Sequence, residues 1–159
     1  MKIFLLTITF WLCLFSDIKF SETKYLSALD IDMTKYGSMN YKNNILILTY
    51  ARPSHEKIIY YEDRLTLQSD DSEITQYTYE EHPQIEYFGL LLKAIVGNNY
   101  DSLSNMFEIT KENNAKILTA KASVSSTINY LEVVHKNSKL KRIIFYMTNE
   151  DKITIETIN

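Results

Sequence analysis

The sequence predicts a mostly β protein in which one apolar helix crosses a long antiparallel sheet. Three observations lead to this fold class. Short extended runs fill residues 20–79, an apolar helical pattern follows at 84–96, and alternation of apolar and polar residues returns from residue 117. A sheet of many strands tends to curl. A lone apolar helix between two sheet blocks then buries its surface best across the concave face.

The first block consists of short strands separated by turn signals. Ile45 to Tyr50 is a nearly continuous apolar run that follows the turn signal Asn43-Asn44. Pro53 ends this run, because proline cannot donate a hydrogen bond to a neighbouring strand. Further strands are expected at Lys57–Tyr61 and Arg64–Gln68, which flank the hairpin signal Glu62-Asp63, and at Glu73–Tyr79.

The helix is expected from Gln84 to Val96. Pro83 suits the first helical position, where a missing N–H costs nothing. The apolar residues that recur at helical spacing are Ile85, Phe88, Leu92, Ile95 and Val96, and Leu90 and Leu91 widen this stripe. Gly97-Asn98-Asn99 is typical of a helix end. A short helical turn is expected within Tyr100–Phe107.

The second block contains four predicted strands. They are Ile117–Ala122, Thr127–His135, Leu140–Met147 and Lys152–Ile158, with turns at Lys136–Lys139 and Asn149–Asp151. Leu140–Met147 has the clearest pattern, because Ile143, Phe145 and Met147 alternate with the residues between them. No repeat or linker interrupts the chain.

Residues 1–16 have the pattern of a secretory signal peptide. Lys2 supplies one positive charge, Ile3–Phe15 carries no charge, and Ser16 provides a small residue at the exit. The apolar run is shorter than the roughly 20 residues that cross a bilayer as a helix. We therefore expect cleavage after Ser16 and a single domain at 17–159, with a retained membrane anchor as the alternative.

Cys13, the only cysteine, lies inside this segment and raises a second alternative, a lipid-anchored lipoprotein. Lipoprotein signals have a small residue just before that cysteine, whereas here Phe10, Trp11 and Leu12 precede it. Removing 16 of the 159 residues leaves 143 without cysteine or tryptophan. The predicted mature chain therefore has no disulfide framework.

Composition argues against several classes of function. The net charge is −3, and losing Lys2 makes it −4, which disfavours nucleic acid as a partner. Glycine-rich phosphate loops, cysteine pairs for zinc and a Gly-x-Ser-x-Gly nucleophile motif are absent from the sequence. Glu80-Glu81-His82 with Glu86 imitates a metal cluster but suits the start of a helix. We expect no catalytic site, no metal and no cofactor.

Several local motifs, taken in order, resemble LolA, the family of periplasmic lipoprotein carriers. They are Phe20-Ser21-Glu22-Thr23-Lys24, Gly37-Ser38-Met39, the stretch from Asn44 to Pro53, Glu62-Asp63-Arg64-Leu65, Leu91-Leu92 through Gly97-Asn98 with Leu103 and Phe107, Leu140–Ile143 and Asn149–Ile155. The resemblance covers nearly all of the predicted mature chain.

The resemblance implies an incomplete β-barrel whose helical lid covers an apolar cavity for acyl chains. It also implies a monomeric chaperone in the periplasm. Such a chaperone takes lipoproteins from an inner-membrane ABC-type exporter and delivers them to the outer membrane, to an acceptor if one is present.

The chain departs from the family in places. Lys42-Asn43 stands where the family has Arg-Pro, and that arginine holds the lid closed in LolA proteins. Leu48 replaces a tryptophan of the third strand, and Glu22 replaces a glutamine. These changes leave open a carrier of another lipid.

Leu46, Leu48 and Tyr50 share one face of their strand, and a large apolar face is not left in water without a reason. The predicted lipid-binding cavity consists of Met39, Tyr41, Leu46, Leu48, Tyr50, Ile58, Tyr60, Leu65, Phe88, Leu91, Leu92 and Ile95. Two further alternatives remain: an enzyme on the same fold, and an extracytoplasmic β domain whose apolar faces form only a filled core.

Overall fold

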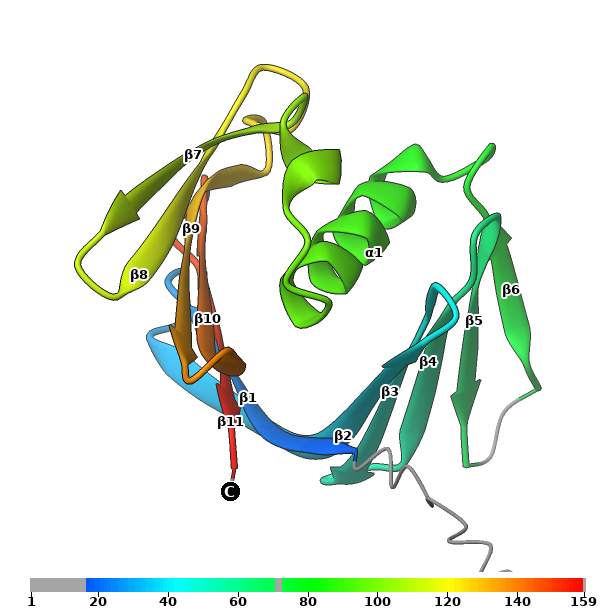
Figure 1. Ribbon diagram of the computed structural model, residues 1–159. Coiled ribbons are helices and arrows are strands. Elements are labelled where there is room, and N and C mark those ends of the chain that lie inside the picture. The colour runs from blue at the N-terminus through cyan, green and yellow to red at the C-terminus, as the bar shows by residue number, and fades with distance from the viewer. Residues whose placement is uncertain (1–16, 71–72, 159) are drawn as a thin grey trace, which may run out of the picture.

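The computed structural model describes residues 17–70 and 73–158, and Figure 1 shows their arrangement. The described residues form one antiparallel sheet of 11 strands in the order β6-β5-β4-β3-β2-β1-β11-β10-β9-β8-β7. The predicted signal segment 1–16, with Cys13, lies outside the described residues. In the described part of the chain, no helix combines the length and apolar character that spanning a membrane requires.

The elements follow one another as two blocks of strands around one helical connection. The first block is β1 (Ile18–Leu26), β2 (Ile31–Lys42), β3 (Ile45–Arg52), β4 (Glu56–Tyr60), β5 (Arg64–Ser69) and β6 (Thr75–Thr78). The helix α1 (Pro83–Val96) and the 3-10 helix η1 (Asp101–Leu103) come next. The second block is β7 (Phe107–Glu112), β8 (Ala115–Ala120), β9 (Ile128–Lys136), β10 (Lys139–Met147) and β11 (Lys152–Thr157).

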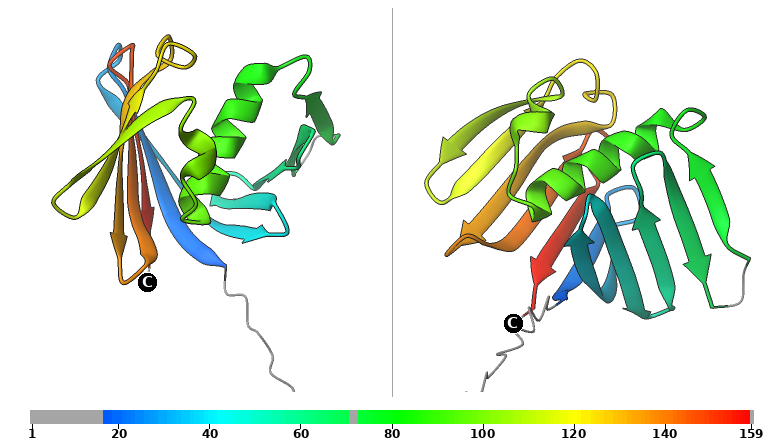
Figure 2. Two further views of the ribbon diagram at one scale, coloured as in Figure 1. Left: turned by 45° about the horizontal axis from the view of Figure 1, so that its top comes forward. Right: turned by 45° about the vertical axis from the view of Figure 1, so that its right-hand side comes forward.

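The strand order explains the position of α1. Within each block, consecutive strands are neighbours, and the pairing of β1 with β11 joins the blocks in the middle of the sheet. The strands β6 and β7 therefore lie at opposite edges, and the chain between them has to cross the sheet. The sheet is curved and unclosed, and α1 crosses its concave side (Figures 1 and 2). The coarse fold prediction is confirmed.

Asparagine supplies most of the backbone conformations that tight turns need. Asn43 and Asn44 have φ of 51° and 62°, and Asn137 has 52°, whereas no described glycine has a positive φ. Because Lys42 pairs with Ile45, the turn between β2 and β3 contains only those two asparagines. Two positive φ values match the turn type that suits the twist of a hairpin.

Two of the glycines instead let α1 approach the sheet closely. A Cβ on Gly89 would lie 2.7 Å from Cδ1 of Tyr60, and a Cβ on Gly97 would lie 2.9 Å from Cε1 of Tyr41. Both distances are shorter than ordinary van der Waals contact, so any larger residue would push the helix outward or displace a ring.

The strand predictions were incomplete in the second block. The region Phe107–Glu112 forms the edge strand β7, which was not predicted; only the helical turn at η1 matches the expectation for that region. Polar residues dominate β7, so the alternation signal is weak there. The next strand begins at Ala115 and ends at Ala120, two residues earlier at each end than expected.

Candidate functional site

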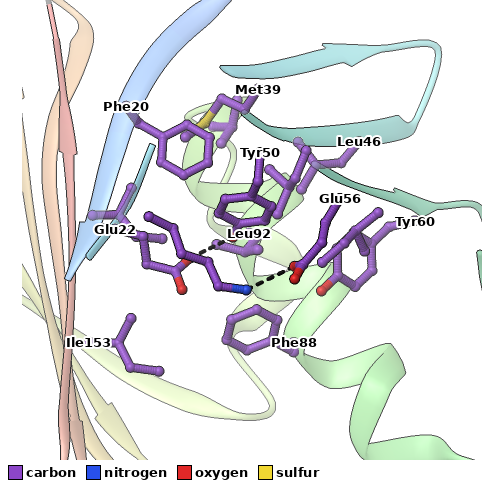
Figure 3. A pocket seen from close by; sticks show the side chains of 15 residues that line it. Phe20, Glu22, Met39, Leu46, Tyr50, Glu56, Tyr60, Phe88, Leu92 and Ile153 are labelled. Atoms are coloured by element: carbon purple, nitrogen blue, oxygen red, sulfur yellow. Dashed lines mark hydrogen bonds and ion pairs between the residues drawn. The ribbon is translucent and has the colours of Figure 1, made fainter. Parts of the chain in front are cut away.

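A cavity of about 210 Å³ lies between α1 and the concave face of the sheet. Figure 3 shows that its side chains come from both the strands and the helix. The lining residues are Phe20, Glu22, Lys35, Met39, Leu46, Leu48, Tyr50, Glu56, Ile58, Tyr60, Phe88, Leu92, Val96, Ile153 and Ile155.

Strand register brings the apolar part of this lining together. Leu48 pairs with Met39 on one side and with Ile58 on the other, and Leu46 pairs with Tyr60. Residues directly opposite in an antiparallel pair point to the same face. The three neighbouring strands β2, β3 and β4 therefore present a continuous apolar wall toward α1.

Eight of the twelve predicted site residues line this cavity: Met39, Leu46, Leu48, Tyr50, Ile58, Tyr60, Phe88 and Leu92. The other four lie elsewhere. Tyr41 contacts α1 beside Gly97, and Leu65 is buried on β5. Leu91 lines a second cavity, and Ile95 is fully buried in the core. Lipid binding by any of them stays a prediction.

The second cavity, of about 170 Å³, lies on the other side of Phe88. Its walls include Leu91, Phe107 and Ile128, and Phe88 lines both cavities. The Phe88 ring lies 5.5 Å from the ring of Phe145 and 6.5 Å from that of Tyr60, measured between centroids. This one side chain therefore stands between the two spaces.

The core around β9 and β10 is filled. Leu131, Val133, Ile143 and Phe145 have no exposed surface. Close packing of this kind is what a core without function requires. The two cavities that Phe88 separates flank α1, and the one nearest β3 and β4 is the larger of the two.

Three charged residues in the cavity wall were not predicted as site residues. In the register of β1 and β2, Lys35 lies directly opposite Glu22. The Lys35 ammonium forms an ion pair with Glu56, at 2.8 Å from a carboxylate oxygen. Glu22 and Phe20 lie two positions apart on β1, and both line the cavity. A charge at every second position of a strand usually indicates a wet face, so the sequence carries no signal that separates these residues from surface ones.

Tyrosine connects the charged residues to the apolar wall. The Tyr50 hydroxyl donates a hydrogen bond of 2.5 Å to Oε2 of Glu22, and Nζ of Lys35 lies 5.1 Å from the centre of the Tyr50 ring. Burial, followed by the charge of Glu22, raises the pKa of Tyr50, so the phenol stays a neutral donor. The hydrogen bond from Lys35 lowers the pKa of Glu56.

A few polar links attach α1 to the sheet. Nζ of Lys93 donates to the backbone carbonyl of Tyr61 at 2.8 Å, and the hydroxyl of Tyr79 donates to the same oxygen at 3.2 Å. Lys93 is only 6% exposed, and this burial lowers its pKa. On the other side, His135 forms a hydrogen bond with the backbone of Ile95.

The acidic residues before α1 have local structural partners. Thr78 donates a hydrogen bond to Glu81, and the ring of His82 lies edge-on to that of Tyr77. Among residues 17–70 and 73–158, no group of three or more histidine, cysteine, aspartate or glutamate side chains is arranged to hold a metal ion. The expectation that the protein is not an enzyme stays a prediction.

Comparison with known proteins adds no family assignment to this geometry. No protein-family model matches the chain, and no curated protein matches it. The resemblance to LolA therefore stays a prediction.

Proposed function

We propose that the protein is a monomeric periplasmic carrier that shields the acyl chains of lipoproteins between α1 and the curved sheet. In this proposal it receives them from an inner-membrane ABC-type exporter and delivers them to the outer membrane. The observation that carries the proposal is the apolar cavity beneath the only α-helix of the described residues. Each methylene moved from water into such a cavity contributes about 0.8 kcal/mol.

The size of the cavity implies that α1 moves when cargo binds. A space of about 210 Å³ is below the range of about 300–1,000 Å³ that is common for ligand sites. The two spaces beside Phe88 together fall within that range. The structure then corresponds to a closed state, in which α1 acts as a lid and cargo displaces Phe88.

The attachment of α1 suits a lid. The helix closes the gap of an unclosed sheet and is not itself part of any strand ladder. Its charged link to the sheet is the bond from Lys93 to Tyr61. Elements that gate a site come from the less stable parts of a fold, because they open without unfolding the rest.

The proposal is tested by native mass spectrometry of protein isolated from a periplasmic extract. We expect a co-purified acylated protein or lipid with the wild type and with Leu90→Lys, but not with Leu92→Lys. The two positions share one helix, yet Leu92 is 2% exposed and lines the cavity, whereas Leu90 is 38% exposed. Circular dichroism checks that both variants fold. Equal cargo in both variants, or none in the wild type, contradicts the proposal.

A carrier of a different lipid is the second candidate. The family's lid-holding arginine corresponds in position to Lys42-Asn43, and here Asn43 lies in the turn between β2 and β3. That turn is exposed and is not part of the cavity wall. The mass of the co-purified molecule distinguishes the two candidates, because an acylated protein and a free lipid differ greatly in mass.

A further inference from the structure

The charged residues of the cavity are partly exposed to solvent: the side chains of Lys35 and Glu56 are 34% and 25% exposed. Tyr50 and Glu56 line the cavity and also line an open depression of about 190 Å³ beside His55 and Asp70. Phe88 and Leu92 of α1 cover the apolar part. The cavity therefore has an apolar part and a polar, partly exposed part formed by Glu22, Lys35, Tyr50 and Glu56, which we call the polar mouth.

The polar mouth carries an uncompensated negative charge. Lys35 and Glu56 form an ion pair at 2.8 Å and neutralise each other. The partner of Glu22 is the hydroxyl of Tyr50, which is neutral. In Figure 3 the Glu22 carboxylate points into the space between Tyr50 and Ile153. The charged side chains of the mouth, one lysine and two glutamates, therefore sum to a net charge of −1, which a cationic ligand head would balance.

We propose that the polar mouth binds a primary ammonium group, attached to an amphiphile whose acyl chain fills the apolar interior. An ammonium supplies three hydrogen-bond donors and the missing positive charge. A head whose only charged group is a carboxylate or a phosphate would instead face Glu22 as a like charge. This inference rests on the proposed carrier function and narrows its cargo to acylated amines.

Two natural sources carry this chemistry. One is the free amino terminus of an acylated protein, and the other is an ethanolamine headgroup. A diacylated cysteine peptide and its N-acetylated form test the first source. Short-chain phosphatidylethanolamine and phosphatidylcholine test the second. Tighter binding of the peptide with the free amino group supports the first source, and tighter binding of phosphatidylethanolamine supports the second. If the two members of each pair bind with equal affinity, in both pairs, the ammonium site is overturned.

Titration calorimetry with decylammonium, decanol and decanoate tests the charge preference itself. Decylammonium and decanol carry the same decyl chain, so the apolar contribution cancels between them. A charge-assisted hydrogen bond corresponds to about tenfold in affinity. We therefore expect decylammonium to bind about tenfold more tightly than decanol, and decanoate to bind most weakly.

The variants change the charge of the mouth in opposite directions. Glu22→Gln keeps an oxygen for Tyr50 but removes the charge, so the preference for decylammonium should disappear. Lys35→Met leaves Glu56 without its cationic partner and should increase the preference for decylammonium. Glu156→Gln is the matched control, because Glu156 is exposed on β11 and next to Ile155, which points to the cavity. It should behave as the wild type.

The outcomes separate this inference from the carrier function. Equal affinity for all three probes keeps the carrier but overturns the ammonium site. Tighter binding of decanoate that is lost in Lys139→Met would place the ligand head in a different depression, which Val96 and Lys139 line, and would also overturn the ammonium site. If no probe binds, the carrier proposal itself fails. Should Glu22→Gln not fold, Lys35→Met alone decides by the direction of its shift.

Discussion

Gly89→Ala tests whether α1 is pressed against the sheet. An added Cβ would lie 2.7 Å from Cδ1 of Tyr60, so the helix or the ring has to move by roughly 0.7 Å to reach the 3.4 Å of ordinary contact. Tyr60 is only 5% exposed and lies in contact range of the Phe88 ring, so it has little room. The easier movement is a displacement of α1 away from the sheet.

Two opposing contributions set the size of the effect. Alanine in place of glycine within a helix stabilises the folded state by about 0.8–1 kcal/mol. Overpacking in a filled site costs about 1–3 kcal/mol. The net expectation is a destabilisation of about 0–2 kcal/mol. We also expect a local effect: α1 should become less stable than the sheet, because the strain falls on α1 and the strands keep their pairing.

Urea unfolding measures the change in global stability, and hydrogen–deuterium exchange measures the local effect on α1. Amides of α1 should exchange faster in Gly89→Ala, while those of β10 stay as protected as in the wild type. In a Tyr60→Val background, where the ring is gone, the same change should instead stabilise the protein, because only helix propensity remains. If Gly89→Ala alone stabilises the protein by about 1 kcal/mol and slows exchange in α1, the helix is not in close contact with Tyr60.

Three further predictions concern the cavity and pH. Phe88→Glu should abolish acyl binding while the amides of β10 remain protected; loss of all protection would make α1 a fixed core element. Leu48→Ala should cost about 1 kcal/mol less in urea unfolding than Leu131→Ala, because Leu48 borders the cavity and has fewer contacts to lose; equal costs would mean that the cavity is filled. Burial, and then the charge of Lys116, lowers the pKa of His135, so the folded state binds fewer protons, and stability should fall as pH drops below about 6.5. His135→Gln should lessen that loss between pH 7.5 and 5.5, and an unchanged pH profile would exclude His135 as its source.

Local patterns were enough to predict the helix and most of the cavity wall. Strand side chains alternate between faces, so the shared parity of Leu46, Leu48 and Tyr50 placed them together before any tertiary information. The helical spacing of Phe88 and Leu92 did the same for α1. These periodicities depend only on backbone geometry within one element. For that reason eight of the twelve predicted residues line the cavity.

Only the tertiary structure decided where the charges and the empty space lie. Glu22 lies opposite Lys35 in the register of β1 and β2, and the Lys35 side chain reaches past β3 to Glu56 on β4; no local pattern encodes these pairings. The polar edge strand β7 forms because β8 offers it a partner, not because its own alternation is strong. Whether an apolar face is filled or hollow depends on the side chains that oppose it across the fold. Local sequence patterns therefore determined which apolar residues of β3 and α1 face inward, and the pairing of β1 with β11 and the path of α1 decided what they enclose.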